Sequence, residues 1–131
     1  MAQSQLRQLR QLKKKKRPVR EQVGAKEWET RVNLAACYRL MHGFGMTEMI
    51  ANHISARVPG THDQFLINPY GMLYEEMTAS SMIRVDIEGN VLFNATDYGI
   101  NQAGYVIHSA VHAARHDVEC IIHTHTLAGM A

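Results

Sequence analysis

The segment Cys120-Ile121-Ile122-His123-Thr124-His125-Thr126 constrains the fold most, because two imidazoles at positions i and i+2 follow an apolar run. In a β-strand such residues point to the same face, about 6.5–7 Å apart along the chain. Both rings can then converge on one ion, and neutral imidazole is a common ligand of zinc and related divalent metals. The alternative is a histidine pair at the polar end of a strand, without a metal.

Length and composition predict one globular domain. A chain of 131 residues with 46% hydrophobic and 20% charged residues can bury an adequate core. No apolar run approaches the roughly 20 residues that span a bilayer, and no segment resembles a secretory signal, so we expect a cytoplasmic protein without membrane contact. Cys37 and Cys120 lie far apart in apolar segments, which favours reduced core thiols over a disulfide.

The positive charge is concentrated at the N-terminus. Residues 1–20 carry eight basic residues and no acid, whereas residues 21–131 carry six basic and twelve acidic residues. We predict a basic, disordered tail over residues 1–22 and one domain over residues 23–131. A nuclear-targeting or nucleic-acid-binding arm and a mitochondrial transit peptide are alternatives for the tail. No aromatic residue stands among the charges, so nucleic acid is not favoured as a partner.

The pattern of apolar residues predicts an α/β or α+β layered domain, in which strands paired locally alternate with helices. The first helix is expected from about residue 25 to the glycines at 43 and 45, with Trp28, Val32, Ala35, Ala36 and Leu40 on its apolar face. The further predicted elements are a helical turn at 46–50, strands at 54–58, 64–68, 82–87, 91–93 and 119–125, and helices at 101–115 and from 127.

The remaining histidines are predicted to lie on the surface. His108, His112 and Arg115 stand at i, i+4 and i+7 on one stripe of the predicted second helix. A metal site at His108 and His112 is the alternative, but the glutamate of the hydrolytic H-E-x-x-H motif is missing. We therefore predict a polar stripe that faces solvent or a neighbouring subunit. His42 and His62 are expected at exposed ends of elements.

Several separate runs occur in an order that resembles the class II aldolase/adducin family. They are NLAACYRLMHGFG, NHISARVPG, FLINPYG, MTASSMIRVD, NQAGYVIHSAVHAARHDVEC and IIHTHT, within residues 25–131. The resemblance implies a three-layer α/β/α fold with a central, largely antiparallel sheet, which would be incomplete at its C-terminal side in this chain. It also implies a homo-oligomer, since family enzymes are typically tetramers with active sites between subunits.

The same resemblance implies a zinc ion, or another divalent metal, held by His123 and His125. In the enzymes of the family the metal stabilises an enediolate that forms when a C–C bond breaks. Their third histidine would fall after Ala131, so we expect weak metal binding by this chain. The family's catalytic glutamate matches Gly104, and glycine cannot transfer a proton. No catalytic residue is therefore assigned, and whether the chain is an enzyme stays open.

The resemblance places substrate-binding loops at Asn52 and His53 and at Tyr70 and Gly71. Backbone and side-chain donors there would bind a phosphate or carboxylate, whereas ordinary turn chemistry is the alternative. The expected function is metal-dependent C–C lyase, epimerase or decarboxylase chemistry on a small phosphorylated or carboxylated sugar derivative, impaired by the missing C-terminal part. The alternatives are a non-catalytic adducin-like association module of the actin and cytoskeleton type, and an inactive fragment.

Overall fold

The computed structural model describes residues 17–131, so most of the predicted tail lies outside the described residues. The first element is the short 3-10 helix η1 (Val19–Glu21), whose Val19 side chain is buried. The packed part of the chain therefore begins inside the segment predicted as a tail. None of the helices within residues 17–131 has the length and apolar character needed to cross a membrane.

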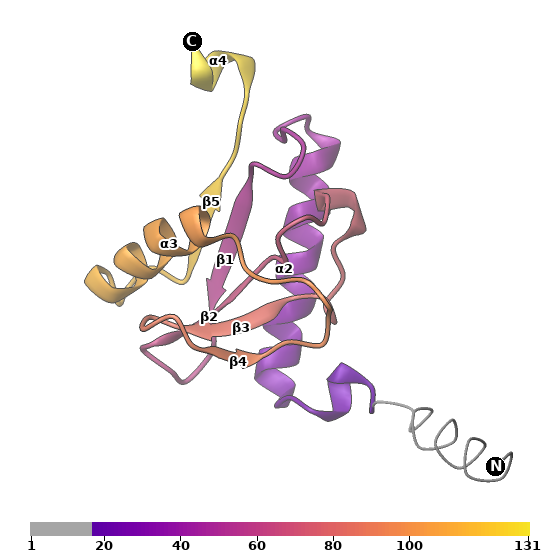
Figure 1. Ribbon diagram of the computed structural model, residues 1–131, viewed down its shortest axis with the longest axis vertical. Helices are drawn as coiled ribbons and strands as arrows, with labels where there is room; N and C mark the ends of the chain where they lie inside the picture. Colours follow the sequence, from indigo (N-terminus) through magenta and orange to yellow (C-terminus); the bar gives the residue numbers. More distant parts are fainter. Residues whose placement is uncertain (1–16) are drawn as a thin grey trace, which may run out of the picture.

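A five-stranded sheet lies between two long helices (Figure 1). The strand order is β4-β3-β2-β1-β5, and every neighbouring pair is antiparallel. The elements that follow η1 are α2 (Ala25–Gly43), β1 (His53–Arg57), β2 (Gln64–Ile67), η2 (Tyr74–Glu76), β3 (Ile83–Asp86), β4 (Val91–Phe93), α3 (Gln102–Ala114), β5 (Cys120–His123) and α4 (Leu127–Met130). The predicted strands are confirmed, with ends that differ by one or two residues.

Strand β1 is buried on both faces because α2 covers one side of the sheet and α3 the other. Successive strand residues point to opposite faces, so Ile54 and Ala56 pack under α2 while His53 and Ser55 meet α3. The predicted three-layer α/β/α arrangement is thus confirmed, and β1 is the strand that contributes to both interfaces.

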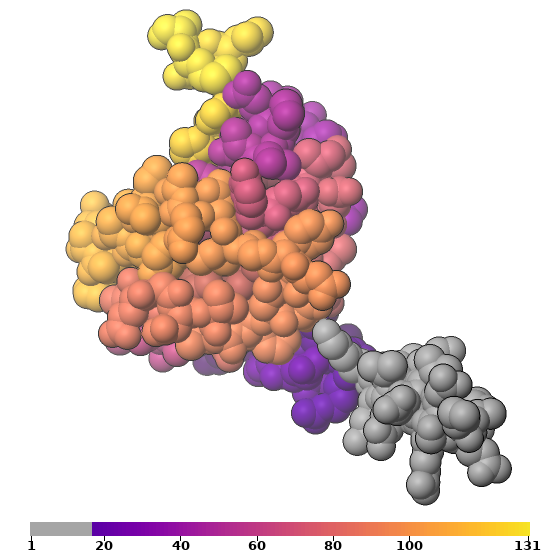
Figure 2. Space-filling model, in the orientation of Figure 1, coloured from indigo at the N-terminus to yellow at the C-terminus, as the bar shows by residue number. Residues whose placement is uncertain are grey.

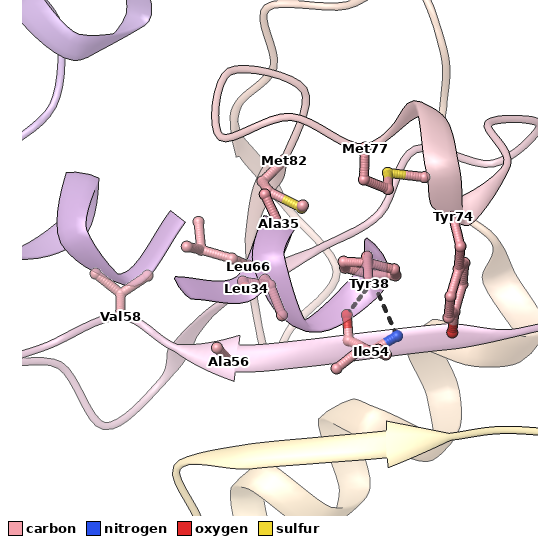
Figure 3. Packing of buried hydrophobic residues seen from close by; sticks show 10 residues of the cluster. All are labelled: Leu34, Ala35, Tyr38, Ile54, Ala56, Val58, Leu66, Tyr74, Met77 and Met82. Atoms are coloured by element: carbon pink, nitrogen blue, oxygen red, sulfur yellow. Dashed lines mark hydrogen bonds between the residues drawn. The ribbon is translucent and has the colours of Figure 1, made fainter. Parts of the chain in front are cut away.

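The core between α2 and the sheet is centred on Tyr38 (Figure 3). The Tyr38 hydroxyl accepts a hydrogen bond from the Ile54 amide at 2.9 Å and contacts the Ile54 carbonyl. Its ring packs edge-on against Tyr74, with centroids 4.5 Å apart. A buried hydroxyl needs such partners, and these fix the height of α2 over β1.

The predicted apolar face of α2 is partly wrong. Val32 and Leu40 are 46% and 56% exposed, whereas the charged side chains of Glu27 and Arg31 are buried. Arg31 Nε donates to Glu27 at 2.9 Å and Nη1 to the Met82 carbonyl at 2.7 Å, so two of the three nitrogens of a guanidinium that periodicity alone would place in water are hydrogen-bonded. The two cysteines are free; Cys37 is half-buried and Cys120 is exposed, so only the first contacts the core.

Candidate functional site

The register between β1 and β5 brings two histidines together. His53 and His123 are directly paired across the antiparallel strands, so their side chains leave the same face of the sheet. Their rings stack with centroids 4.4 Å apart and planes inclined by 29°. The H-x-H segment therefore faces the side of the sheet that α3 covers.

His125 lies beyond the end of β5, which stops at His123, but its ring still converges with that of His123. The two Nε2 atoms are 3.0 Å apart. The His125 amide donates to the Met46 carbonyl at 3.2 Å, and its Nδ1 lies 2.5 Å from a Glu48 carboxylate oxygen. A carboxylate on Nδ1 holds the proton there and leaves Nε2 free to bind an ion.

The segment that carries Glu48 is a non-helical turn, so the helical turn predicted at residues 46–50 is wrong. The Asn52 side-chain oxygen accepts a hydrogen bond from the Glu48 amide at 2.5 Å and competes with helical pairing. Met49 has a positive φ of 46°, an uncommon conformation for a residue with a side chain. Such backbone often occurs at functional sites, and Met49 directly follows Glu48, which contacts His125.

Helix α3 presents two further histidines to the same face. The prediction of a solvent-facing stripe is wrong, because His108 and His112 are both 0% exposed. Asn101 caps the helix by accepting from the Ala103 and Gly104 amides, and Arg57 donates to the His112 and Arg115 carbonyls at its other end. These bonds at both ends set which face of α3 meets the sheet.

Four of these side chains form a continuous row of hydrogen-bonding contacts, which we call the histidine–serine chain. His53 Nδ1 lies 2.7 Å from His108 Nε2, and His108 Nδ1 lies 2.5 Å from the Ser55 hydroxyl. The same hydroxyl is 2.9 Å from His112 Nε2. The partners on β1 thus pair three of the four ring nitrogens of the two α3 histidines, whereas His112 Nδ1 has no hydrogen-bond partner.

Burial keeps these imidazoles neutral. Desolvation, followed by the neighbouring His53, His112 and His123 rings, lowers the pKa of His108 to about 3. Desolvation and then Arg57 lower the pKa of His112 to about 4. The pKa of His123 is lowered by desolvation and by His125, so these rings are unprotonated at neutral pH.

The predicted substrate-binding residues occupy different environments. Asn52 and His53 are buried, and Asn52 Nδ2 has no hydrogen-bond partner. Tyr70 is 49% exposed and lines a cleft of about 440 Å³. Gly71 has φ 102° beside the Tyr98 ring, so its role in this turn is conformational. The cleft is lined by Glu48, Met49, Ile50, Ala51, Tyr70, Asn101 and Ala103.

The two Nε2 atoms of His123 and His125 fit part of a metal site. Two nitrogens bound tetrahedrally to one zinc ion at the usual bond length lie about 3.3 Å apart, close to the 3.0 Å found here. Residues 17–131 hold no group of three or more histidine, cysteine or acidic side chains arranged to bind a metal. The chain therefore offers two converging ligands and the carboxylate that orients one of them.

Sequence reasoning missed four residues of this site. Ser55, His108 and His112 form the histidine–serine chain together with His53, and Glu48 contacts His125 although 77 positions separate the two. The i, i+4 spacing of His108 and His112 was the available signal for α3, but it does not tell which way a stripe faces. Nothing in the local sequence links Glu48 to His125.

Comparison with known proteins agrees with this architecture. Residues 32–131 match the family described as Class II Aldolase and Adducin N-terminal domain. The crystal structure of an aldolase II superfamily protein from Pseudomonas syringae is 54% identical with a TM-score of 0.83, over 86% of this chain and 45% of that one. L-fuculose 1-phosphate aldolase from Glaciozyma antarctica is 34% identical with a TM-score of 0.72, over 79% and 42%.

The chain belongs to the class II aldolase and adducin family. Alpha-adducin of Mus musculus is 50% identical over 77% of this chain and 14% of its own length. A Pseudomonas aeruginosa protein named with the class 2 aldolases is 59% identical over 86% of this chain. The chain spans 43% of the length of that relative, so it corresponds to less than half of the relative's chain.

Proposed function

We propose that this chain carries the metal-binding part of a class II aldolase-type site, which acts on a small phosphorylated or carboxylated sugar derivative. One observation carries the proposal: the Nε2 atoms of His123 and His125 lie 3.0 Å apart, and the Glu48 carboxylate contacts Nδ1 of His125. When bound, a zinc or related divalent ion would supply a Lewis acid for an oxygen of the substrate.

The surroundings of the pair support a site for a small polar molecule. Glu48 both contacts His125 and lines the 440 Å³ cleft, so the cleft reaches the group that orients the candidate ligand. Tyr70 and Asn101 add polar groups to its wall. The sugar-phosphate class is favoured by the likeness to L-fuculose 1-phosphate aldolase, whose substrate class we extend to this chain as part of the proposal.

An association module without catalysis is the second candidate, favoured by the 50% identity to alpha-adducin. The two functions differ in what they require of His123 and His125. A lyase, epimerase or decarboxylase needs both nitrogens free to bind an ion, whereas an association module needs only a stable fold. Metal binding therefore separates the two candidates.

Replacing His123 or His125 by alanine is expected to abolish zinc binding by the full chain, measured by isothermal titration calorimetry. Binding by the unaltered chain should be weak, because two of the three protein ligands usual for catalytic zinc are present. Glu48→Gln should weaken binding by about 10–100-fold, since it removes the carboxylate that orients His125.

The matched control is His116→Ala, which removes an exposed imidazole remote from the H-x-H pair in the sheet. Its zinc affinity should equal that of the unaltered chain. Equal zinc binding by the His123→Ala and His116→Ala variants would show that the ion binds elsewhere and would count against the proposal.

We also propose that the chain associates with copies of itself. β4 and β5 are the outermost strands of the described sheet, and α4 stands clear of the body (Figure 2). Ile122 on β5 and Leu127 on α4 are 49% and 90% exposed, and apolar groups beside an open strand edge favour association. Sedimentation velocity at micromolar concentration should show species larger than 14.8 kDa, reduced by Ile122→Lys; a single monomeric species would contradict this.

A further inference from the structure

The backbone of His123 is bonded from the side of the sheet opposite to its ring. The ring faces α3, whereas the His123 carbonyl accepts a hydrogen bond from the Tyr74 hydroxyl at 3.3 Å. Tyr74 lies in η2 and belongs to the core between α2 and the sheet. Within residues 17–131 this hydroxyl makes no other hydrogen bond. The core under α2 therefore contacts the candidate metal ligand through its main chain.

The Tyr74 side chain is held in one place. It is 1% exposed, and its ring packs edge-on against Tyr38 with its hydroxyl towards the sheet (Figure 3). The turn that carries it is closed by the Leu73 amide, which donates to a Glu76 carboxylate oxygen at 2.8 Å. A packed tyrosine has two side-chain torsions and few rotamers, so its hydroxyl cannot follow a partner that moves. The hydroxyl is thus a fixed point beside the end of β5.

The ring of His123 is held separately, on the α3 side of the sheet. It stacks on the His53 ring with centroids 4.4 Å apart. The His53 ring in turn lies against Gly104, where an added Cβ would be 2.7 Å from the His53 Cδ2 atom. Carbon atoms do not approach a ring this closely without a shift of one partner, so His53 fills the space between the first turn of α3 and the sheet. The His123 ring therefore has a close and fixed neighbour.

The peptide between His123 and Thr124 decides where His125 lies. The peptide unit is planar, so fixing its carbonyl oxygen fixes the direction in which the chain leaves His123. β5 ends at His123, and the next backbone bond runs from the His125 amide to the Met46 carbonyl at 3.2 Å. A hydrogen bond on each side of Thr124 therefore holds the span that brings the two Nε2 atoms within 3.0 Å.

We propose that Tyr74 is a positioning residue of the His123–His125 pair. Its hydroxyl donates to the His123 carbonyl, which can only accept, and so fixes the peptide that sets the separation of the two Nε2 atoms. The inference rests on the proposed function, because it treats the two histidines as metal ligands. The metal site then extends through the sheet into the core under α2, and Tyr74 acts on the ion without touching it.

Tyr74→Phe tests this on the full chain, because it removes the hydroxyl and keeps the ring. We expect zinc affinity, measured by isothermal titration calorimetry, to fall by about 3–10-fold, less than the roughly 10–100-fold typical of a partner bonded to a ligand's own ring. The matched control is Tyr38→Phe, which removes the neighbouring hydroxyl that holds the Ile54 amide of β1 at 2.9 Å. Its urea midpoint should fall at least as far as that of Tyr74→Phe, whereas its zinc affinity should equal that of the unaltered chain.

A loss of affinity confined to Tyr74→Phe supports the inference. Equal affinity in Tyr74→Phe and the unaltered chain overturns it, and the proposed function then stands if His123→Ala still abolishes binding. Equal losses in Tyr74→Phe and Tyr38→Phe also overturn it, since they would assign the effect to a weaker core.

A second measurement needs no metal and decides the matter if zinc binding proves independent of His123. In ¹³C and ¹⁵N spectra of the metal-free chain, Tyr74→Phe should shift the carbonyl carbon of His123 and the amide of His125, and Tyr38→Phe should not. Unmoved signals in Tyr74→Phe would overturn the inference. If Tyr74→Phe does not fold, the unaltered chain is used: its Tyr74 hydroxyl proton should exchange slowly with water, and fast exchange would overturn the inference.

Discussion

Lowering the pH from 7 to 5 is expected to reduce the free energy of unfolding by about 4 kcal/mol, through His108 and His112 together. Their pKa values in the folded chain are about 3 and about 4, below the 6.5 of an unfolded chain. Below pH 6.5 these histidines therefore become protonated in the unfolded chain but stay neutral in the folded chain. Their effect on the free energy of unfolding is negligible above pH 6.5, and the free energy of unfolding falls as the pH decreases towards 4.

The charges around the two rings act in the same direction. His53 on β1 and His112 on α3 face His108, and Arg57 on β1 faces His112, so a proton on either ring would meet other basic groups. Desolvation is also the main cause that lowers the pKa of His53 to about 4, so His53 contributes to the same loss of stability at low pH.

Urea unfolding followed by circular dichroism at several pH values measures this dependence. His108→Gln should lower the slope of stability against pH, whereas His116→Gln, which changes an exposed imidazole, should keep the slope of the unaltered chain. Equal urea midpoints at pH 7 and pH 5 would contradict the expected burial of neutral histidines.

Arg31→Ala is expected to reduce the free energy of unfolding by about 3–5 kcal/mol, because it leaves the carboxylate of Glu27 buried with only part of its charge balanced. Arg31 is 0% exposed and Glu27 is 6% exposed. The guanidinium also donates to the Met82 carbonyl at 2.7 Å and lies over the Phe93 ring at 5.1 Å, so its loss frees an acceptor and a packing surface as well.

Two further variants separate the buried charge from general damage to α2. Glu27→Met combined with Arg31→Met removes both charges and should be less destabilised than Arg31→Ala, since Arg84 is 28% exposed and can turn to water. Arg39→Ala removes an exposed arginine of the same helix together with its hydrogen bond to the Met77 carbonyl at 3.0 Å, and should cost about 1 kcal/mol. An equal loss in Arg31→Ala and the double variant would show that the unpaired carboxylate is not the cause.

The layered fold could be predicted because its signals are local. Glycines end α2, Pro59 and Gly60 turn β1 into β2, and the apolar runs match the strands within one or two residues. Strand periodicity predicts that His123 and His125 share one face; β5 ends at His123, and the two rings still converge. These features depend on neighbours in the sequence, which periodicity and turn chemistry describe well.

The rest of the site could not be predicted because it depends on pairings between distant segments. The register that sets His53 against His123 is a property of two strands. The sequence favours a polar surface for His108 and His112, because burying an imidazole is unfavourable unless another element supplies a hydrogen-bond partner. Ser55 on β1 is that partner, and its position cannot be predicted from α3 alone. Arg31 was missed for the same reason: its partners include a carbonyl 51 positions away.

The His53 ring lies so close to Gly104 that it affects the order in which these two residues can change during evolution. The side chains of residues 53 and 104 would occupy the same space. A larger residue at 104 therefore overpacks the site while His53 is present, but it fits once residue 53 has become smaller. The change at 53 is therefore expected to precede the change at 104. Among members of this family, we expect the residues at these two positions to vary together.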